Sequence, residues 1–153
     1  MLDAAFESRQ DALDGFLGAA HALHVVARLA TMAEGRDLQR SVGSGDGAWS
    51  AESDRAGRGR WRNHEGLHPT GDDAAQFEPT VYLYDNYPGG IGLSEPLFRR
   101  AEGLIRESRA LIQHCACAHG CPACVGPTLI APDDPARSPK QLAAKVLDLL
   151  AES

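Results

Sequence analysis

The clearest periodic pattern lies near the beginning of the chain. Between Ser8 and Ala33, apolar residues recur at intervals of three and four positions, which predicts a long amphipathic helix. The apolar residues of this helix are Leu13, Phe16, Leu17, Ala20, Leu23, Ala27 and Ala30. Gly15 and Gly18 interrupt the pattern, and each lowers helix propensity by about 1 kcal/mol relative to alanine. We therefore interpret the two glycines as points of close packing.

The periodicity disappears between Gly35 and Phe77, where Gly, Ser, Asp, Arg and His predominate. A compact domain seldom contains so long a loop without structure of its own. We expect a flexible insertion over residues 35–77 within a single domain of residues 1–153, with a short hairpin around Trp49 and Trp61 as the alternative.

Four arginines and a tryptophan are concentrated inside this segment. Arginine neutralises phosphate groups, and an aromatic ring stacks on an unpaired base, so these side chains are the best candidates for contacts with nucleic acid. The candidates are Arg55, Arg58, Arg60, Trp61 and Arg62. Acidic residues surround them, and short charge runs usually face solvent, so a solvated loop is the favoured alternative.

A strand and two further helices are predicted after this segment. Thr80–Asp85 alternates aliphatic with aromatic residues, as strands do, and a turn rich in proline and glycine follows. Ser94 and Pro96 have the chemistry of a helix start, and Ser138 and Pro139 repeat it before the last helix. The predicted fold is therefore an α-rich α+β domain. It has a long N-terminal helix, a small strand element, a capped helix that leads into a cysteine loop, and a C-terminal helix.

All four cysteines of the chain lie in the ten-residue run that follows the capped helix. A tetrahedral zinc ion takes four thiolates at about 2.3 Å, and Gly120 and Pro122 favour the turns that direct four sulfurs to one centre. The predicted ligands of one structural Zn²⁺ ion are Cys115, Cys117, Cys121 and Cys124. Four thiolates leave no open coordination position, so this metal is expected to stabilise structure and to perform no chemistry.

The same cysteines are open to three other interpretations. Disulfides would close rings of only a few residues, which their geometry disfavours. An iron–sulfur cluster also takes four cysteines, but the spacing of Cys115 and Cys117 departs from the bacterial ferredoxin pattern. A redox pair of Cys121 and Cys124 would need a thioredoxin-like context. Zinc is favoured, and an iron–sulfur or thiol redox protein is retained as the alternative.

Histidines near the cysteines or in the first helix could add metal ligands. His114 and His119 adjoin the cysteines, but four thiolates already complete a closed site, so we expect supporting or surface roles, with His119 the better substitute ligand. His21 and His24 lie three positions apart without a third ligand. We interpret them as packed or surface side chains.

Composition limits the classes of function. The chain has 153 residues, 43% hydrophobic and 24% charged, as an ordinary globular domain has. Its net charge of −6 argues against a protein that coats nucleic acid by bulk charge, so any such contact must be local. No signal peptide and no long apolar run are evident, which with reduced cysteines predicts a cytoplasmic protein without membrane contact.

The order of Tyr82–Glu95, a helix and the run Cys115–Cys124 resembles the C-terminal zinc-binding domain of MrfA-type superfamily 2 DNA helicases. The resemblance covers Tyr82 to Val125 and implies that the four cysteines hold zinc. It further implies a domain that accompanies ATP-driven translocation and unwinding of DNA, notably in repair.

The chain lacks the Gly-Lys-Thr or Gly-Lys-Ser motif of a P-loop and the acidic Walker B box. We therefore expect an accessory domain that is not catalytic by itself. Its expected partners are helicase motor domains, in cis or in trans, and single-stranded or forked DNA. A protein–protein interaction module is a further alternative.

Overall fold

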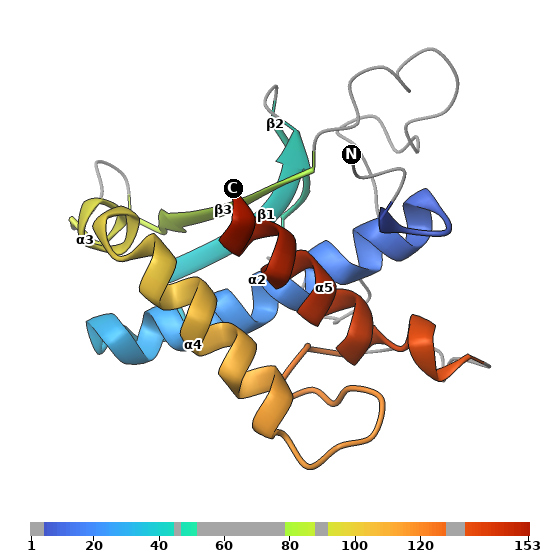
Figure 1. The fold of residues 1–153 in the computed structure, drawn as a ribbon. Helices are drawn as coiled ribbons and strands as arrows, with labels where there is room; N and C mark the ends of the chain where they lie inside the picture. The colour runs from blue at the N-terminus through green and yellow to red at the C-terminus, as the bar shows by residue number, and fades with distance from the viewer. Residues whose placement is uncertain (1–4, 45–46, 52–78, 88–91, 128–133) are drawn as a thin grey trace.

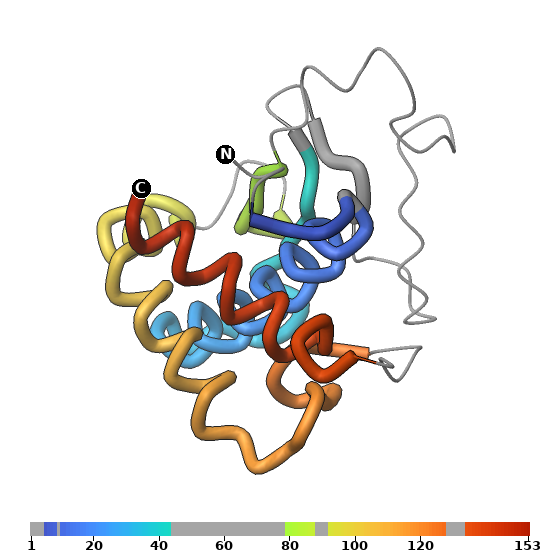
Figure 2. The backbone as a smooth tube through the Cα atoms, turned by 45° about the vertical axis from the view of Figure 1, so that its right-hand side comes forward, coloured from blue at the N-terminus to red at the C-terminus, as the bar shows by residue number. Residues whose placement is uncertain are grey.

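A long helix between a sheet and two further helices organises the fold. The computed structural model describes residues 5–44, 47–51, 79–87, 92–127 and 134–153. Helix α2 (Arg9–Thr31) packs against α4 (Ala101–His114) and α5 (Pro139–Glu152), and it contacts the sheet with another part of its surface. Figures 1 and 2 show this central position of α2 from two sides.

Helix α2 begins and ends with local capping interactions. The Ser8 hydroxyl accepts a hydrogen bond from the Asp11 N–H at 3.1 Å, which satisfies one of the free donors of the first turn. At the other end, Met32 adopts a left-handed conformation with φ of 52°. The observed bounds, Arg9–Thr31, confirm the helix predicted between Ser8 and Ala33.

The sheet has three antiparallel strands. Its centre is β1 (Leu38–Ser44), with β2 (Gly47–Ala51) on one side and β3 (Thr80–Asp85) on the other. Strand β3 confirms the predicted strand. Strands β1 and β2 occupy part of the segment for which the alternatives were a flexible insertion and a hairpin, and residues 52–78 lie outside the described part of the chain.

The sequence concealed β1 because its inward positions are not all apolar. Leu38, Arg40 and Val42 alternate along the strand, and all three are buried, at 0%, 9% and 1% exposure. An arginine in the middle of the inward series removes the apolar alternation by which a half-buried strand is recognised.

The helix predicted to begin at Ser94 is divided in two. Helix α3 (Ser94–Arg99) is followed by Arg100, whose φ of −107° interrupts the helix before α4. The prediction that Ser94 caps this helix is wrong, because the cap position is Leu93. Asp85 instead holds the start of the helix: its carboxylate accepts from the Leu93 N–H and from the Ser94 hydroxyl, both at 3.3 Å. A carboxylate there is also favoured by the helix dipole.

The core lies where α5 crosses α2. The Ser138 hydroxyl caps α5 by accepting from the Gln141 N–H, which confirms the predicted start of this helix. A Cβ atom added at Gly15 would lie 2.8 Å from the Leu142 carbonyl oxygen, and one at Gly18 would lie 2.8 Å from the Ala143 Cβ. The two glycines therefore mark close packing, which confirms the prediction from the sequence.

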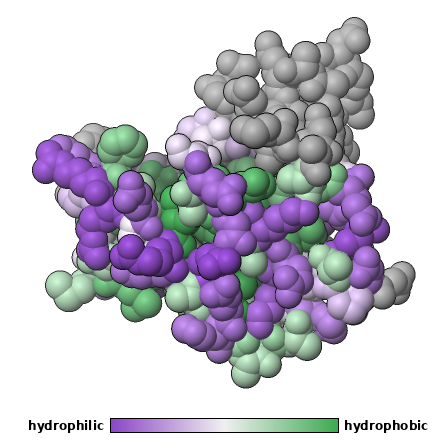
Figure 3. All heavy atoms as spheres, viewed as in Figure 1, coloured by the Kyte–Doolittle hydropathy of each residue, from purple (hydrophilic) through white to green (hydrophobic). Residues whose placement is uncertain are grey.

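One face of the molecule is predominantly hydrophilic over its described residues. In the face shown in Figure 3, most of the described residues are hydrophilic, and hydrophobic residues form smaller patches between them. None of the described helices combines the length and the apolar character that a membrane-spanning segment needs.

Candidate metal centre

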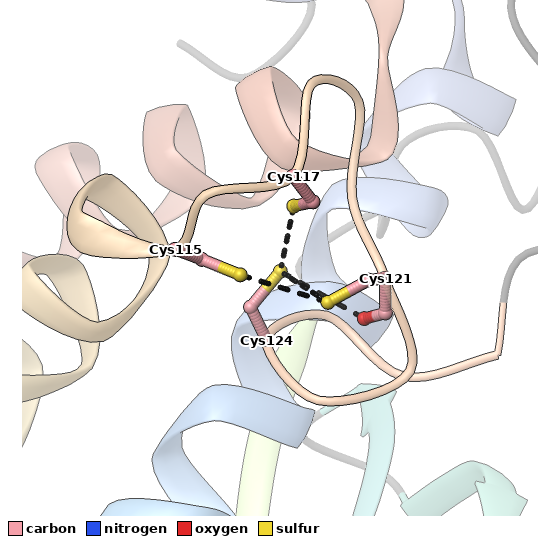
Figure 4. A group of neighbouring side chains, drawn as sticks. All are labelled: Cys115, Cys117, Cys121 and Cys124. Atoms are coloured by element: carbon pink, nitrogen blue, oxygen red, sulfur yellow. Dashed lines mark hydrogen bonds between the residues drawn. The ribbon is translucent and has the colours of Figure 1, made fainter.

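The loop after α4 brings the four cysteine sulfurs together. Cys115 Sγ lies 3.6 Å from Cys121 Sγ, and Cys117 Sγ lies 3.6 Å from Cys124 Sγ. These two separations each join one cysteine of the first half of the loop to one of the second, so the two halves face each other across a common centre (Figure 4). Within the second half, Cys121 Sγ lies 3.7 Å from Cys124 Sγ. All four sulfurs lie within 4.8 Å of one another.

These separations fit a single tetrahedral ion. Sulfurs at about 2.3 Å from a tetrahedral zinc ion lie about 3.8 Å from one another. A disulfide would need about 2.05 Å, and all four cysteines are free. An iron–sulfur cluster inserts several iron and sulfide atoms between its thiolates, whereas sulfurs 3.6 Å apart leave room for one ion. The geometry therefore favours zinc over both alternatives.

A tight turn shapes the second half of the loop. The N–H groups of Cys124 and Val125 both donate to the Cys121 carbonyl at 3.1 Å. Gly120 precedes this turn with φ of 121°, a conformation that side chains rarely adopt. A Cβ atom at Gly120 would also lie 2.7 Å from Val125 Cγ2. The glycine predicted from the sequence to turn the loop is thus required both by its backbone angle and by packing.

Two of the thiols differ in acidity. Peptide N–H groups of Cys124 and Ala123 lower the pKa of Cys121 to about 7. Burial raises the pKa of Cys124 to about 12. A thiol held protonated at neutral pH must lose its proton when it binds a metal, so metal binding here is coupled to proton release.

The first half of the loop is held from α5. Lys140 Nζ donates to the carbonyl oxygens of Cys115 and Cys117, both at 2.7 Å. The Lys140 main-chain N–H also donates to the His119 carbonyl at 3.0 Å. Lys140 could not be recognised from the sequence, because nothing in a lysine 16 positions beyond the last cysteine distinguishes it from a surface lysine.

The second half of the loop is held from α2 and β1. His21 Nε2 lies 3.3 Å from the Ala123 carbonyl, and Arg40 donates to the Nδ1 atoms of His21 and His24 at 2.9 and 2.7 Å. His24 Nε2 completes the set with the Leu38 carbonyl at 2.7 Å. Each imidazole thus accepts at Nδ1 and donates at Nε2, which is the neutral tautomer.

Burial and the nearby guanidinium keep these histidines uncharged. They lower the pKa of His21 to about 4, and burial lowers the pKa of His24. Burial and the charge of Arg28 in turn lower the pKa of Arg40 to about 10. His21 and His24 are therefore packed side chains rather than metal ligands, in agreement with the sequence interpretation.

The remaining site predictions concern other histidines and the arginine-rich segment. Among the described residues, the cysteines alone form a group that can hold a metal, and the carbonyl group of His119 accepts from the Lys140 N–H.

The candidate nucleic-acid contacts lie outside the described residues and stay predictions. They are Arg55, Arg58, Arg60, Trp61 and Arg62.

Comparison with protein families decides the class of this metal site. The MrfA Zn-binding domain family matches residues 19–125, which include both halves of the cysteine loop and the sheet behind it. The chain belongs to the MrfA Zn-binding domain family. It accordingly holds one structural Zn²⁺ ion.

Individual relatives agree with this membership. The uncharacterized ATP-dependent helicase YprA of Bacillus subtilis (strain 168) is 52% identical over 48 residues, which are 31% of this chain and 6% of the helicase. The uncharacterized protein MJ1572.1 of Methanocaldococcus jannaschii is 42% identical over 45 residues, 29% of this chain and 40% of that protein.

A solved structure extends the likeness to most of the fold. The crystal structure of the DUF1998 helicase MrfA bound to DNA superposes with a TM-score of 0.61 and 26% identity. The match covers 94% of this chain but 15% of that helicase. The chain therefore spans a small part of the helicases that it resembles.

Proposed function

We propose that residues 1–153 form one accessory domain of an ATP-dependent DNA helicase, non-catalytic by itself, in which Cys115, Cys117, Cys121 and Cys124 bind the zinc ion. The observation that carries the proposal is the closed set of four thiolates in a domain whose structural relative is part of a DNA-bound helicase. Four protein ligands leave zinc no position for a water or a substrate. The metal would therefore stabilise the loop and the surface beside it.

Apolar surface beside the loop supports contact with motor domains, in cis or in trans. A hollow of about 390 Å³ lies between α2, α4 and the loop, with Val26, Leu111 and Ala123 among its lining residues. Leu29 in α2 and Met32 directly after this helix are 75% and 92% exposed. Apolar surface of this kind is typical of contacts with another protein surface.

DNA contact is proposed through the arginine-rich segment rather than through overall charge. The net charge of −6 opposes general attraction to phosphate. Arg58, Arg60 and Trp61 combine phosphate neutralisation with base stacking, a combination suited to single-stranded or forked DNA. DNA repair is the context that follows from the family resemblance, and reduced thiolates suit the cytoplasm.

Metal analysis and DNA titration test this proposal together. The purified chain should contain one zinc per molecule, show no ATP hydrolysis and bind forked DNA weakly, with an affinity that falls as salt rises. Zinc with no salt-dependent DNA affinity would favour a protein-binding module. A brown protein that contains iron would contradict the zinc site itself.

A further inference from the structure

We propose that Lys140 is a positioning residue of the metal centre, which sets the geometry of Cys115 and Cys117 and offsets part of the charge of the thiolates. The inference rests on the proposed ligation by the four cysteines. It assigns a role to a residue outside the cysteine run, on a different element of the fold.

The two halves of the loop differ in how they are supported. The Cys121–Cys124 half is closed by its own main chain, because two N–H groups donate to the Cys121 carbonyl. In the described part of the chain, no main-chain hydrogen bond within the loop closes the Cys115–Cys117 half. The carbonyl groups of both cysteines instead bind the Lys140 ammonium, each at 2.7 Å.

This contact fixes the direction of both sulfurs. Cys115 is extended, with φ of −65° and ψ of 130°, and its sulfur and that of Cys117 converge with the other two sulfurs within 4.8 Å of one another. One ammonium bound to both carbonyls holds the intervening peptides in that arrangement. Cys115 and Cys117 are then presented as a pair to Cys121 and Cys124.

The positive charge of Lys140 also offsets negative charge at the metal centre. Four thiolates and one Zn²⁺ ion carry a net charge of −2, and a charge of this size inside a protein needs nearby donors or cations. Lys140 brings one positive charge to the backbone of two ligands. Groups in this outer position orient ligands, and their removal typically weakens metal binding by 10- to 100-fold.

The inference is tested with the zinc-loaded full chain. We expect Lys140→Met to transfer zinc to a colorimetric chelator 10 to 100 times faster than the wild type. Lys140→Arg should stay within a few-fold of the wild type because it keeps the charge and can donate to both carbonyls. Lys145→Met is the matched control, since Lys145 lies on the same helix over the Phe6 ring, 5.2 Å from its centroid.

A spectroscopic measurement separates this role from a general loss of stability. In cobalt-substituted protein, loss of the Lys140 charge should shift the sulfur-to-cobalt charge-transfer band, whereas Lys145→Met should leave the band in place. Lys140→Gln, which keeps a donor without the charge, supplies the same comparison if the methionine variant does not fold.

Two results would contradict these proposals. Wild-type zinc-release rates together with an unshifted cobalt band in Lys140→Met and Lys140→Gln would overturn the role of Lys140. Failure of the wild-type chain to bind zinc would instead overturn zinc ligation by the four cysteines. The experiment therefore distinguishes failure of the ligand assignment from failure of the role of Lys140.

Discussion

The Nη2 atom of Arg40 donates to the Nδ1 atom of His21 at 2.9 Å, and the opposite nitrogen of the same imidazole lies 3.3 Å from the Ala123 carbonyl. The imidazole of His21 thus joins Arg40 in the central strand of the sheet to the main chain between Cys121 and Cys124. The contact makes the sheet part of the support of the metal centre, and it leads to the first prediction.

Replacement of Arg40 by methionine should destabilise the domain. It leaves the Nδ1 atoms of His21 and His24 without their donor, and a buried polar group without a partner costs about 1–3 kcal/mol. We expect the free energy of unfolding in urea to fall by about 2–4 kcal/mol. Arg36→Met is the control, because the Arg36 side chain is 77% exposed, and surface changes usually stay within about 0.5 kcal/mol. Equal effects of the two substitutions would contradict the role of Arg40.

Stability should decrease as the pH falls from 6.5 towards 4. Burial and Arg40 lower the pKa of His21 from 6.5 in the free side chain to about 4 in the folded protein. In this interval the unfolded chain binds a proton that the folded chain does not, so the free energy of unfolding falls with decreasing pH.

The measurement is urea unfolding of the wild type and of His21→Gln at pH values where both retain one zinc. The glutamine variant should show a smaller pH dependence because it lacks the imidazole. Parallel curves for the two proteins would show that His21 is not the responsible group.

Loss of a cysteine should release the metal and lower the melting temperature. Changing Cys121 or Cys124 to serine removes a thiolate from a site whose binding energy is coupled to folding. We expect less than one tenth of the wild-type zinc content after dialysis, together with a lower melting temperature. His119→Ala should retain one zinc, since its ring is outside the ligand group. Full zinc retention by the serine variants would refute the ligand assignment.

Alanine substitutions at Gly15 and at Gly103 should change the free energy of unfolding in opposite directions. Gly15→Ala gains about 1 kcal/mol in helix propensity, but its Cβ would lie 2.8 Å from the Leu142 carbonyl oxygen, a backbone atom that cannot easily move. We expect a net loss of about 1–2 kcal/mol in the free energy of unfolding.

Gly103→Ala is the matched control for that substitution. The nearest atom to a Cβ at Gly103 is the end of the Arg106 side chain at 3.9 Å. The domain should therefore become more stable by about 0.5–1 kcal/mol. Stabilisation by both substitutions would contradict the close contact of α2 and α5.

DNA affinity should depend on the arginine-rich segment. Joint replacement of Arg58, Arg60 and Arg62 by alanine removes three positive charges and should weaken binding to forked DNA by at least tenfold at low salt, with a smaller salt dependence. Fluorescence anisotropy measures both quantities. Joint replacement of Arg99 and Arg100, which lie around the break between α3 and α4, is the control. Unchanged affinity in the triple variant would exclude the segment from the DNA site.

Local patterns in the sequence determined the metal loop and most of the helices. The spacing of the cysteines and the turn chemistry of Gly120 act within ten residues, and the Ser138 cap acts within one helical turn. Such short-range geometry depends little on the rest of the molecule. The zinc site could therefore be predicted before the fold was known.

Only the tertiary structure decided what holds the loop in place. His21 and Ala123 are 102 positions apart, and Lys140 lies 25 positions from Cys115. Asp85 binds the Leu93 N–H and the Ser94 hydroxyl at the start of α3 because the end of β3 lies beside that helix. Contacts between distant residues depend on how helices and strands pack, and no local periodicity records them. A buried arginine such as Arg40 even conceals its own strand, since its partners come from another element.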